Sequence, residues 1–364
     1  MTSRTPQRRE KLKRTLKEDQ ADALLVASVT NVSYLTGFTG DDSTFLLTKK
    51  RAMVISDGRY TTQLEEECPD LDVHIRPVGQ PMMDGVAAVL KKLGIKRLAF
   101  EANVITVAEI DDLREKAKTV ELVGVKNRVE TLRMVKDAGE IEATREAVCH
   151  AERAFAMLRA GLRPDHSEKS IADDLDAFMR RCGAESAAFP PIVGVGAHAA
   201  LPHYRPSDKA KVGDADFVLI DWGAMGRPYK SDLTRVLLTG KVTPKFEKVY
   251  RAVLAAQERG IAAIRPGRTG REVDAEARSV IEEAGFGRFF DHGLGHGLGM
   301  DIHEAPRLRK ESEITLQPGM IVTVEPGVYL PGWGGVRIED DVLVTPEGCE
   351  VLTHVPKSLD EVRP

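Results

Sequence analysis

Four carboxylates lie within or next to apolar, strand-like runs, and this feature constrains the fold more than any other in the sequence. Asp221 follows Val218-Leu219-Ile220, Asp232 precedes a second such run, and Glu325 and Glu339 interrupt two more. Aspartate is a poor strand residue. A buried carboxylate also needs a compensating partner. We therefore expect the strands to gather these acids around a cation.

The first two acids belong to one predicted hairpin. Asp221 and Asp232 are eleven residues apart, and the segment between them contains glycine and proline. A hairpin at this spacing would bring both carboxylates together, and two close carboxylates repel each other unless a cation lies between them. The alternative is a pair of exposed acids in a turn.

A glycine-rich segment adds imidazoles. His292, His296 and His303 fall within twelve residues, although the chain has only nine histidines. Imidazole is both a common metal ligand and an acid or base near neutral pH. The alternative is a flexible glycine-rich loop whose histidines have no joint role, which does not explain their concentration beside the acid-bearing strands.

The last acid lies on a strand with an arginine. Because alternate strand residues share a face, Arg337 and Glu339 should point the same way. Asp340 and Asp341 fit a solvent-facing strand edge instead. Together the four acids supply a charge of about −4, which balances two divalent cations. An oxygen-rich set with one imidazole suits Mn(II), Co(II), Fe(II) or Zn(II).

The chain is long enough for two domains, since it has 364 residues. Residues 1–130 alternate short strands and helices, which predicts a small α/β domain. Residues 131–364 group amphipathic helices with antiparallel hairpins, which predicts an α+β domain. In this second part we expect helices near 137–159, 167–182, 244–264 and 271–284, and strand-like runs at 216–221, 232–239, 320–329 and 336–345.

Composition excludes several other classes. The formal charge of −4 gives no general attraction to nucleic acid or to anionic membranes. The basic residues near the N-terminus are interpreted as the solvated face of a first helix, and no apolar run is long enough to cross a bilayer. The four cysteines are far apart and form no C-x-x-C pair, which favours a reducing, cytoplasmic setting.

Taken together, these motifs resemble the pita-bread metallopeptidases, the family of aminopeptidase P, prolidase and methionine aminopeptidase. The resemblance rests on Asp221-x-Gly, Ser231-Asp232-x-Thr-Arg, His292-Gly-Leu-Gly-His296, His303-Glu, Glu325-Pro-Gly and Val336-Arg337-Ile-Glu339. Asn31-Val-Ser-Tyr and Asp57-Gly-Arg-Tyr in the first part look like the creatinase-type N-terminal domain of Xaa-Pro peptidases, which simple methionine aminopeptidases lack.

The resemblance implies a function and a set of roles. It implies hydrolysis of the bond between an N-terminal residue and a following proline, through a hydroxide that bridges two metal ions, with manganese first and cobalt or zinc as alternatives. The implied ligands are Asp221, Asp232, His296, Glu325 and Glu339. Glu325 would also accept a proton, and the remaining implied catalytic residues are His203, His292, His303 and Arg337. Short proline-containing peptides are the implied substrates, and a homodimer the implied assembly.

Two other functions compete with this one, a creatinase-like hydrolase without metal and a catalytically inactive pita-bread module that binds another protein. Both would be expected to lose ligands, and all five are present. The loop 194–203 departs from the family pattern although His203 keeps its place, and His198 in that loop reads as a surface residue. The sequence leaves prolidase and aminopeptidase P equally open, because Arg307 and Arg309 fit either a carboxylate-binding role or plain surface charge.

Overall fold

The structure, a computed structural model, describes residues 4–363. It separates the chain into two compact units, unit 1 up to Arg133 and unit 2 from Met134 onward. Each unit buries its own apolar core, and unit 2 has two main clusters of core residues. Among the described residues, no helix is long and apolar enough to cross a membrane.

Unit 1 is built on a six-stranded mixed sheet in the order β4-β3-β2-β1-β5-β6. The strands are β1 (Ala23–Val26), β2 (Thr44–Thr48), β3 (Ala52–Asp57), β4 (Asp72–Arg76), β5 (Arg97–Glu101) and β6 (Glu121–Val125). The four inner strands were predicted from their apolar runs. The edge strands β4 and β6 were not predicted, because edge strands are partly exposed and carry polar residues.

Helices cover this sheet. They are α1 (Thr5–Glu18), α2 (Val29–Thr36), α3 (Thr61–Glu67), α4 (Met82–Leu93), α5 (Val107–Lys116) and α6 (Arg128–Arg133). Residues of α4 and α5 pack with the inner strands to form the core of unit 1. The basic start of α1 had been expected to be solvated, but one of its residues is buried. Arg9 is buried, donates to the Leu35 carbonyl at 2.9 Å and pairs with Asp70.

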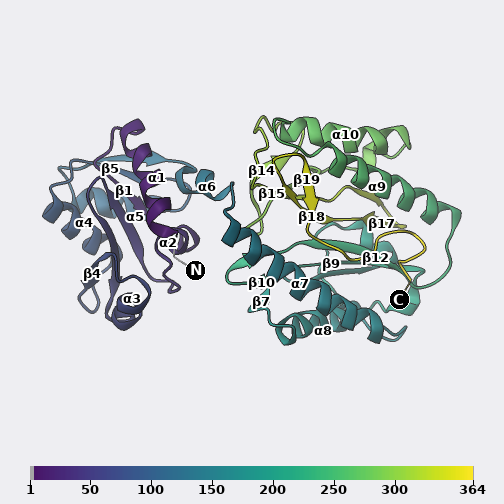
Figure 1. Ribbon diagram of the computed structural model, residues 1–364. Coiled ribbons are helices and arrows are strands. Elements are labelled where there is room, and N and C mark those ends of the chain that lie inside the picture. The colour runs from purple at the N-terminus through teal and green to yellow at the C-terminus, as the bar shows by residue number, and fades with distance from the viewer. Residues whose placement is uncertain (1–3, 364) are drawn as a thin grey trace. The chain divides into compact units, whose positions relative to one another are not determined.

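Unit 2 places two pairs of helices on either side of its strands, α7 with α8 on one side and α9 with α10 on the other (Figure 1). Their bounds are α7 (Ala138–Gly161), α8 (Glu168–Arg181), α9 (Pro244–Ala263) and α10 (Gly270–Glu283). Side-chain caps fix where they begin: Asp137 and Thr269 form capping boxes, and Thr243 caps α9.

The strands of unit 2 form several small antiparallel sheets. They are β7 (Ser186–Ala187), β8 (Ile192–Val195), β9 (Phe217–Trp222), β10 (Ala224–Gly226), β11 (Tyr229–Lys230), β12 (Leu233–Leu238), β13 (Gly295–Gly297), β14 (Glu304–Leu308), β15 (Ile321–Val324), β16 (Gly327–Leu330), β17 (Gly334–Arg337), β18 (Asp340–Val344) and β19 (Cys349–Val351). Three of these sheets carry the acid-bearing segments, and their orders are β12-β9-β8, β14-β13-β15-β18-β19 and β16-β17.

Two runs that had been predicted as single strands are each divided. The run 320–329 becomes β15 and β16, and the run 336–345 becomes β17 and β18. Strand β15 pairs with β18, whereas β16 pairs with β17 in a separate sheet. Each break falls at one of the acids, Glu325 or Glu339, and Pro326 contributes to the first because proline lacks the N–H that a sheet ladder uses.

Candidate metal centre

Strand register brings three of the acids to one place. In the antiparallel pair of β9 and β12, Asp221 lies opposite Thr234, and Asp232 is two residues before Thr234. An isolated bridge joins Thr234 to Glu339, at the junction of β17 and β18. The predicted hairpin therefore exists, with the short strands β10 and β11 inserted between its arms, and Glu339 is added to it from a distant part of the chain.

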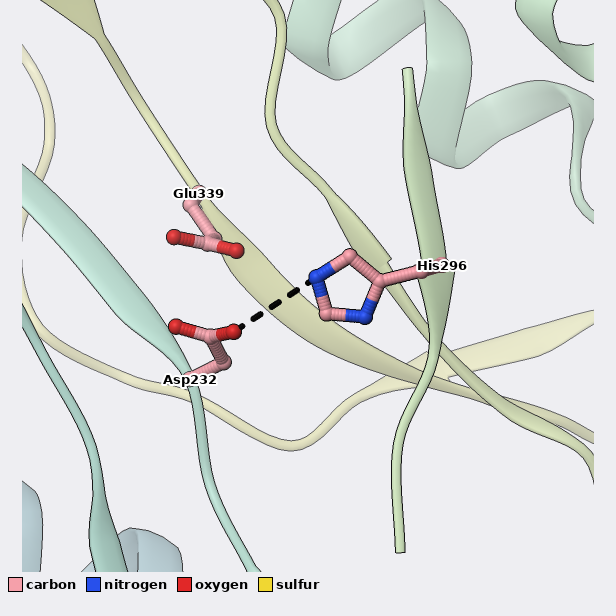
Figure 2. A group of neighbouring side chains, drawn as sticks. All are labelled: Asp232, His296 and Glu339. Carbon is pink, nitrogen blue, oxygen red and sulfur yellow. Dashed lines mark ion pairs between the residues drawn. The ribbon is translucent and has the colours of Figure 1, made fainter. Parts of the chain in front are cut away.

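The centre of the site is formed by Asp232, His296 and Glu339. Figure 2 shows these side chains converging from three separate segments, and one potential ligand atom from each lies within 4.8 Å of the others. All three residues are buried. The Nε2 atom of His296 is 3.6 Å from Asp232 Oδ2 and 3.3 Å from Oε1 of Glu325, which joins the cluster from the end of β15.

The orientation of His296 fits a residue that binds a cation. Its Nδ1 atom is 3.1 Å from the Gly297 carbonyl, so Nδ1 carries the proton and Nε2 presents a lone pair to the carboxylates. Burial lowers the pKa of His296 to about 3, which keeps the ring neutral. A lone pair facing carboxylate oxygens is unfavourable unless a cation binds between them, and this backbone contact is the usual way to orient a ligating histidine.

The carboxylates give the same indication. Burial, and then the charge of neighbouring carboxylates, raises the pKa of Asp232 and of Glu339 well above the ordinary range. Burial also raises the pKa of Asp221, and it raises that of Glu325 to about 7. The Asp221 Oδ1 atom is buried and has no hydrogen-bond partner among the described residues. These residues therefore fit divalent cations, which such a set of oxygen donors and one imidazole would hold.

Arg337 connects two of the acids. Its Nη2 atom donates to Asp221 Oδ2 at 2.5 Å, and its Nε donates to Thr234 Oγ1 at 3.0 Å. Thr234 in turn donates to Glu339 Oε2 at 2.6 Å. The remaining Nη1 donates to the Tyr329 hydroxyl at 2.9 Å. The arginine, which is itself buried, thus fixes the rotamers of groups on either side of the centre.

His292 belongs to the same network. Its Nδ1 is 2.7 Å from the Gly293 carbonyl and its Nε2 is 2.9 Å from the Tyr329 hydroxyl. Burial, and then the charge of Arg337, lowers the pKa of His292 to about 4. The ring is therefore neutral near pH 7, and the Tyr329 O–H donates to its Nε2.

The other two predicted histidines, His203 and His303, are exposed. The ring of His303 meets the ring of His296 edge to face, with centroids 4.5 Å apart. His203 is close enough for its charge to affect the ionisation of Asp221, His292 and His303. Neither is part of the group of buried ligand atoms around Asp232.

The interpretation of Asp340 and Asp341 as a solvent-facing edge was wrong. Asp340 is 1% exposed, and it accepts from Arg235 at 2.7 Å and pairs with Lys357. Burial alone would raise its pKa, but these two cations hold it well below the ordinary value. Asp341 is fully buried, and its Oδ2 accepts the backbone N–H of Asp232 at 3.0 Å. Asp341 thus holds the backbone of Asp232, and Asp340 holds the chain next to Glu339.

Sequence reasoning also missed three hydroxyl groups and the partner of one histidine. Two of these hydroxyls belong to Thr234 and Tyr329. The third is that of Thr323, which donates to Glu325 at 3.3 Å and accepts the backbone N–H of His296. Only the position of Thr234, inside the motif around Asp232, could have suggested a role. The side chain of His198 is 38% exposed, as expected of a surface residue, but its Nδ1 lies 2.7 Å from the fully buried carboxylate of Glu168.

Helix pairs around strands that converge on buried carboxylates and one imidazole define a metal-dependent hydrolase of the pita-bread class. Comparison with known proteins agrees. The model of metallopeptidase family M24 matches residues 142–346, and that of the creatinase/prolidase N-terminal domain matches residues 8–135. The chain belongs to metallopeptidase family M24, with a creatinase/prolidase-type N-terminal domain, and family membership implies divalent metal ions.

Relatives and solved structures match over nearly the whole chain. The Xaa-Pro dipeptidase of Pyrococcus furiosus is 33% identical over 353 residues, which are 97% of this chain and 99% of that one. The structure of an Xaa-Pro dipeptidase from Bacillus anthracis is 39% identical with a TM-score of 0.94, covering 99% of this chain and 100% of the other. An X-Pro aminopeptidase from Thermotoga maritima is 36% identical with a TM-score of 0.87, covering 95% and 99%.

Proposed function

We propose that this protein is a two-metal peptidase that hydrolyses the bond between an N-terminal residue and a following proline. The observation that carries the proposal is the buried cluster of Asp232, His296 and Glu339, extended by Asp221 and Glu325, in a chain whose relatives over nearly its whole length include Xaa-Pro dipeptidases. We assign the metal ligands to these five residues and catalysis to unit 2.

Two divalent cations at such a site supply an acidified water and an electrophile for the scissile carbonyl. The residues of the chain then handle protons and charge. Glu325, whose Oε1 lies 3.3 Å from His296 Nε2 at the centre of the site, would receive a proton from the attacking water. The leaving nitrogen of proline carries no hydrogen in the peptide and must be protonated as the bond breaks, and Glu325 is the group that returns the proton.

The histidines beside the ligands bind the substrate. His303 and His203 are exposed, and they donate N–H groups to the oxyanion that forms at the scissile carbonyl. His292 is neutral and is held by Tyr329, and it lines the side of the site that receives proline. Arg337 positions Asp221 and Tyr329 and contacts the substrate only through them.

A dipeptide is the favoured substrate length, because a cationic side chain points at the site without a partner. Arg307 on β14 lies directly opposite His296 on β13, so both side chains share one face of the pair. Arg307 is half-buried, its guanidinium has no ion pair or hydrogen bond among residues 4–363, and burial lowers its pKa. The free carboxylate of a substrate would pair with this guanidinium, and only a dipeptide carries that carboxylate on its second residue.

We also propose the metal, the cellular setting and the assembly of the enzyme. Manganese is the metal we assign, with cobalt or zinc as alternatives, because the ligand set is rich in oxygen and contains no thiolate. The four cysteines are free, which favours a reducing cytoplasm. A homodimer follows from the resemblance alone, and light scattering after gel filtration would test it.

A panel of matched peptides that differ only at the second residue tests the substrate assignment. The metal-loaded protein should cleave Xaa-Pro far faster than Xaa-Ala, and a chelator should abolish both activities. Equal kcat/KM for proline and alanine with manganese, cobalt and zinc would reduce the assignment to a general aminopeptidase. Full activity in the presence of chelator would remove the metal-dependent mechanism.

A further inference from the structure

A buried carboxylate outside the metal centre gathers an unusual number of donors. Glu168, the first residue of α8, is fully buried. Its Oε1 accepts the Val195 N–H at 2.8 Å and lies 2.7 Å from Nδ1 of His198. Its Oε2 accepts the Tyr204 hydroxyl at 3.0 Å, and both the N–H and the hydroxyl of Ser207, at 3.3 and 3.1 Å. All five donors belong to the segment 195–207.

This segment contains His203, and its anchors enclose that residue. His198 is five residues before His203 and Tyr204 is the next residue, and both bind the same carboxylate. Their rings also stack on each other, with centroids 4.5 Å apart and planes 24° apart. Backbone bonds from Leu201 to His198 and from Tyr204 to Leu201 complete the loop. The backbone around His203 therefore depends on Glu168.

The opposite side of the segment rests on a strand of the metal centre. A Cβ atom on Gly335 of β17 would lie 2.1 Å from the Ala199 carbonyl oxygen, and one on Gly334 would lie 2.5 Å from the Gly196 carbonyl oxygen. Only glycine permits this approach of two backbones. Strand β17 ends at Arg337, which holds Asp221, so the segment lies between the Glu168 carboxylate and the arginine network.

We propose that Glu168 and His198 are positioning residues, which hold the 195–207 segment so that His203 is presented to the substrate beside Asp221. The carboxylate does not reach the reacting atoms and acts through the loop. Its place in the first turn of α8 favours its negative charge, because the N-terminus of a helix is electropositive. The contribution to catalysis rests on the proposed function, whereas the contribution to loop order does not.

The test compares three variants with a control. His198→Ala removes one donor, and His198→Asn restores it, because the asparagine amide nitrogen lies close to the position of Nδ1. Tyr204→Phe removes a second donor at the other end of the loop. His354→Ala is the control, because His354 is an exposed histidine that lies 3.8 Å from Glu152 and is not part of the site. These variants keep Glu168, whose own replacement could unfold the protein.

We expect His198→Ala and Tyr204→Phe to lower kcat/KM on an Xaa-Pro peptide about ten- to a hundredfold, the loss caused by a displaced catalytic group. Metal content should equal that of His354→Ala, and His198→Asn should recover most of the rate. In a His203→Ala background the His198→Ala change should have no further effect. Additive losses in that double variant, or an unchanged rate in both single variants, would overturn the positioning role.

A second readout needs neither metal nor activity. Hydrogen exchange of the metal-free protein should show faster exchange of peptides covering 195–207 in His198→Ala than in wild type, with α8 unchanged. Unchanged protection of that segment would contradict the proposal. If the wild-type protein failed to cleave Xaa-Pro peptides while the exchange result held, the substrate assignment would be wrong. The role of Glu168 and His198 in ordering the segment 195–207 would still be supported.

Discussion

At the scale of single residues, the site depends on side chains that face it without a partner. Arg307 is such a group, and Arg309 two residues later offers a matched control. Arg309 is exposed and pairs with Glu311 at 3.6 Å, so it should contribute nothing to substrate binding.

We predict that Arg307→Ala lowers kcat/KM for an Xaa-Pro dipeptide. The decrease should correspond to a loss of about 1.5–3 kcal/mol in transition-state binding, the usual contribution of a hydrogen bond to a charged group. An Xaa-Pro-Yaa tripeptide should be affected much less, because its carboxylate lies one residue further on. Arg309→Ala should leave both substrates unchanged. Equal losses on the dipeptide and the tripeptide in Arg307→Ala would contradict the dipeptidase assignment.

A second prediction at this scale concerns pH. Burial raises the pKa of Glu325 from 4.5 to about 7, so the folded metal-free protein holds this proton more tightly than the unfolded chain does. The resulting stability is complete below pH 4.5 and disappears as the pH rises through 7, which amounts to a loss on the order of 3 kcal/mol for this carboxyl. Asp232 and Glu339, whose pKa values are also raised, change stability in the same direction.

Denaturant unfolding of the metal-free protein at pH 5 and pH 8 measures this loss. Glu325→Gln, which cannot ionise, should reduce the difference between the two pH values, and manganese should restore stability at pH 8 more than at pH 5. A metal-free protein as stable at pH 8 as at pH 5 would mean that the acids are not held in a buried cluster.

At the scale of elements, the sequence predicted those helices and strands that apolar runs and capping residues determine. The helices of unit 2 and the acids around Asp221 and Asp232 followed from local pattern. What could not be predicted depends on pairing between distant segments. Pro326 is a local sign that the run containing Glu325 breaks, but nothing local shows that its two halves join different sheets, or that Thr234 forms a bridge with Glu339. Likewise, the burial of Asp340 comes from Arg235 and Lys357, which lie in other segments.

The bridge between Thr234 and Glu339 leads to a prediction for β12. Replacing Thr234 by valine keeps the shape but removes the donor to Glu339 and the acceptor for Arg337. We expect metal affinity to fall about 10–100-fold, as happens when an outer hydrogen bond to a ligand is removed. The control is Thr239→Val just beyond the same strand, whose hydroxyl bonds the Ala215 carbonyl. Equal metal affinity in both variants, measured by competition with a chelating dye, would contradict this role.

At the scale of the whole molecule, the five residues that we propose as metal ligands all lie in unit 2, and each unit has its own core. The two tryptophans of the chain, Trp222 and Trp333, are also in unit 2. Trp222 follows Asp221 directly and stacks on Phe155, with ring centroids 4.2 Å apart. Tryptophan fluorescence therefore reports the unfolding of unit 2, whereas circular dichroism reports both units.

Adding metal should raise the unfolding midpoint detected by fluorescence. The free energy of unfolding of unit 2 should increase by about 2.7 kcal/mol when free metal is a hundred times its dissociation constant. A fluorescence-detected midpoint that does not change when metal is added would contradict a metal site in unit 2.

The central claim is that the five residues form a two-metal centre on which hydrolysis depends, and one titration tests it most directly. Metal-stripped protein is titrated with manganese, and bound metal, by elemental analysis, and Xaa-Pro dipeptide hydrolysis are measured in the same samples. We predict two ions per chain, activity that rises with metal occupancy, and loss of both bound metal and activity in Asp232→Ala. Full hydrolysis by the stripped protein, or by Asp232→Ala without bound metal, would contradict it.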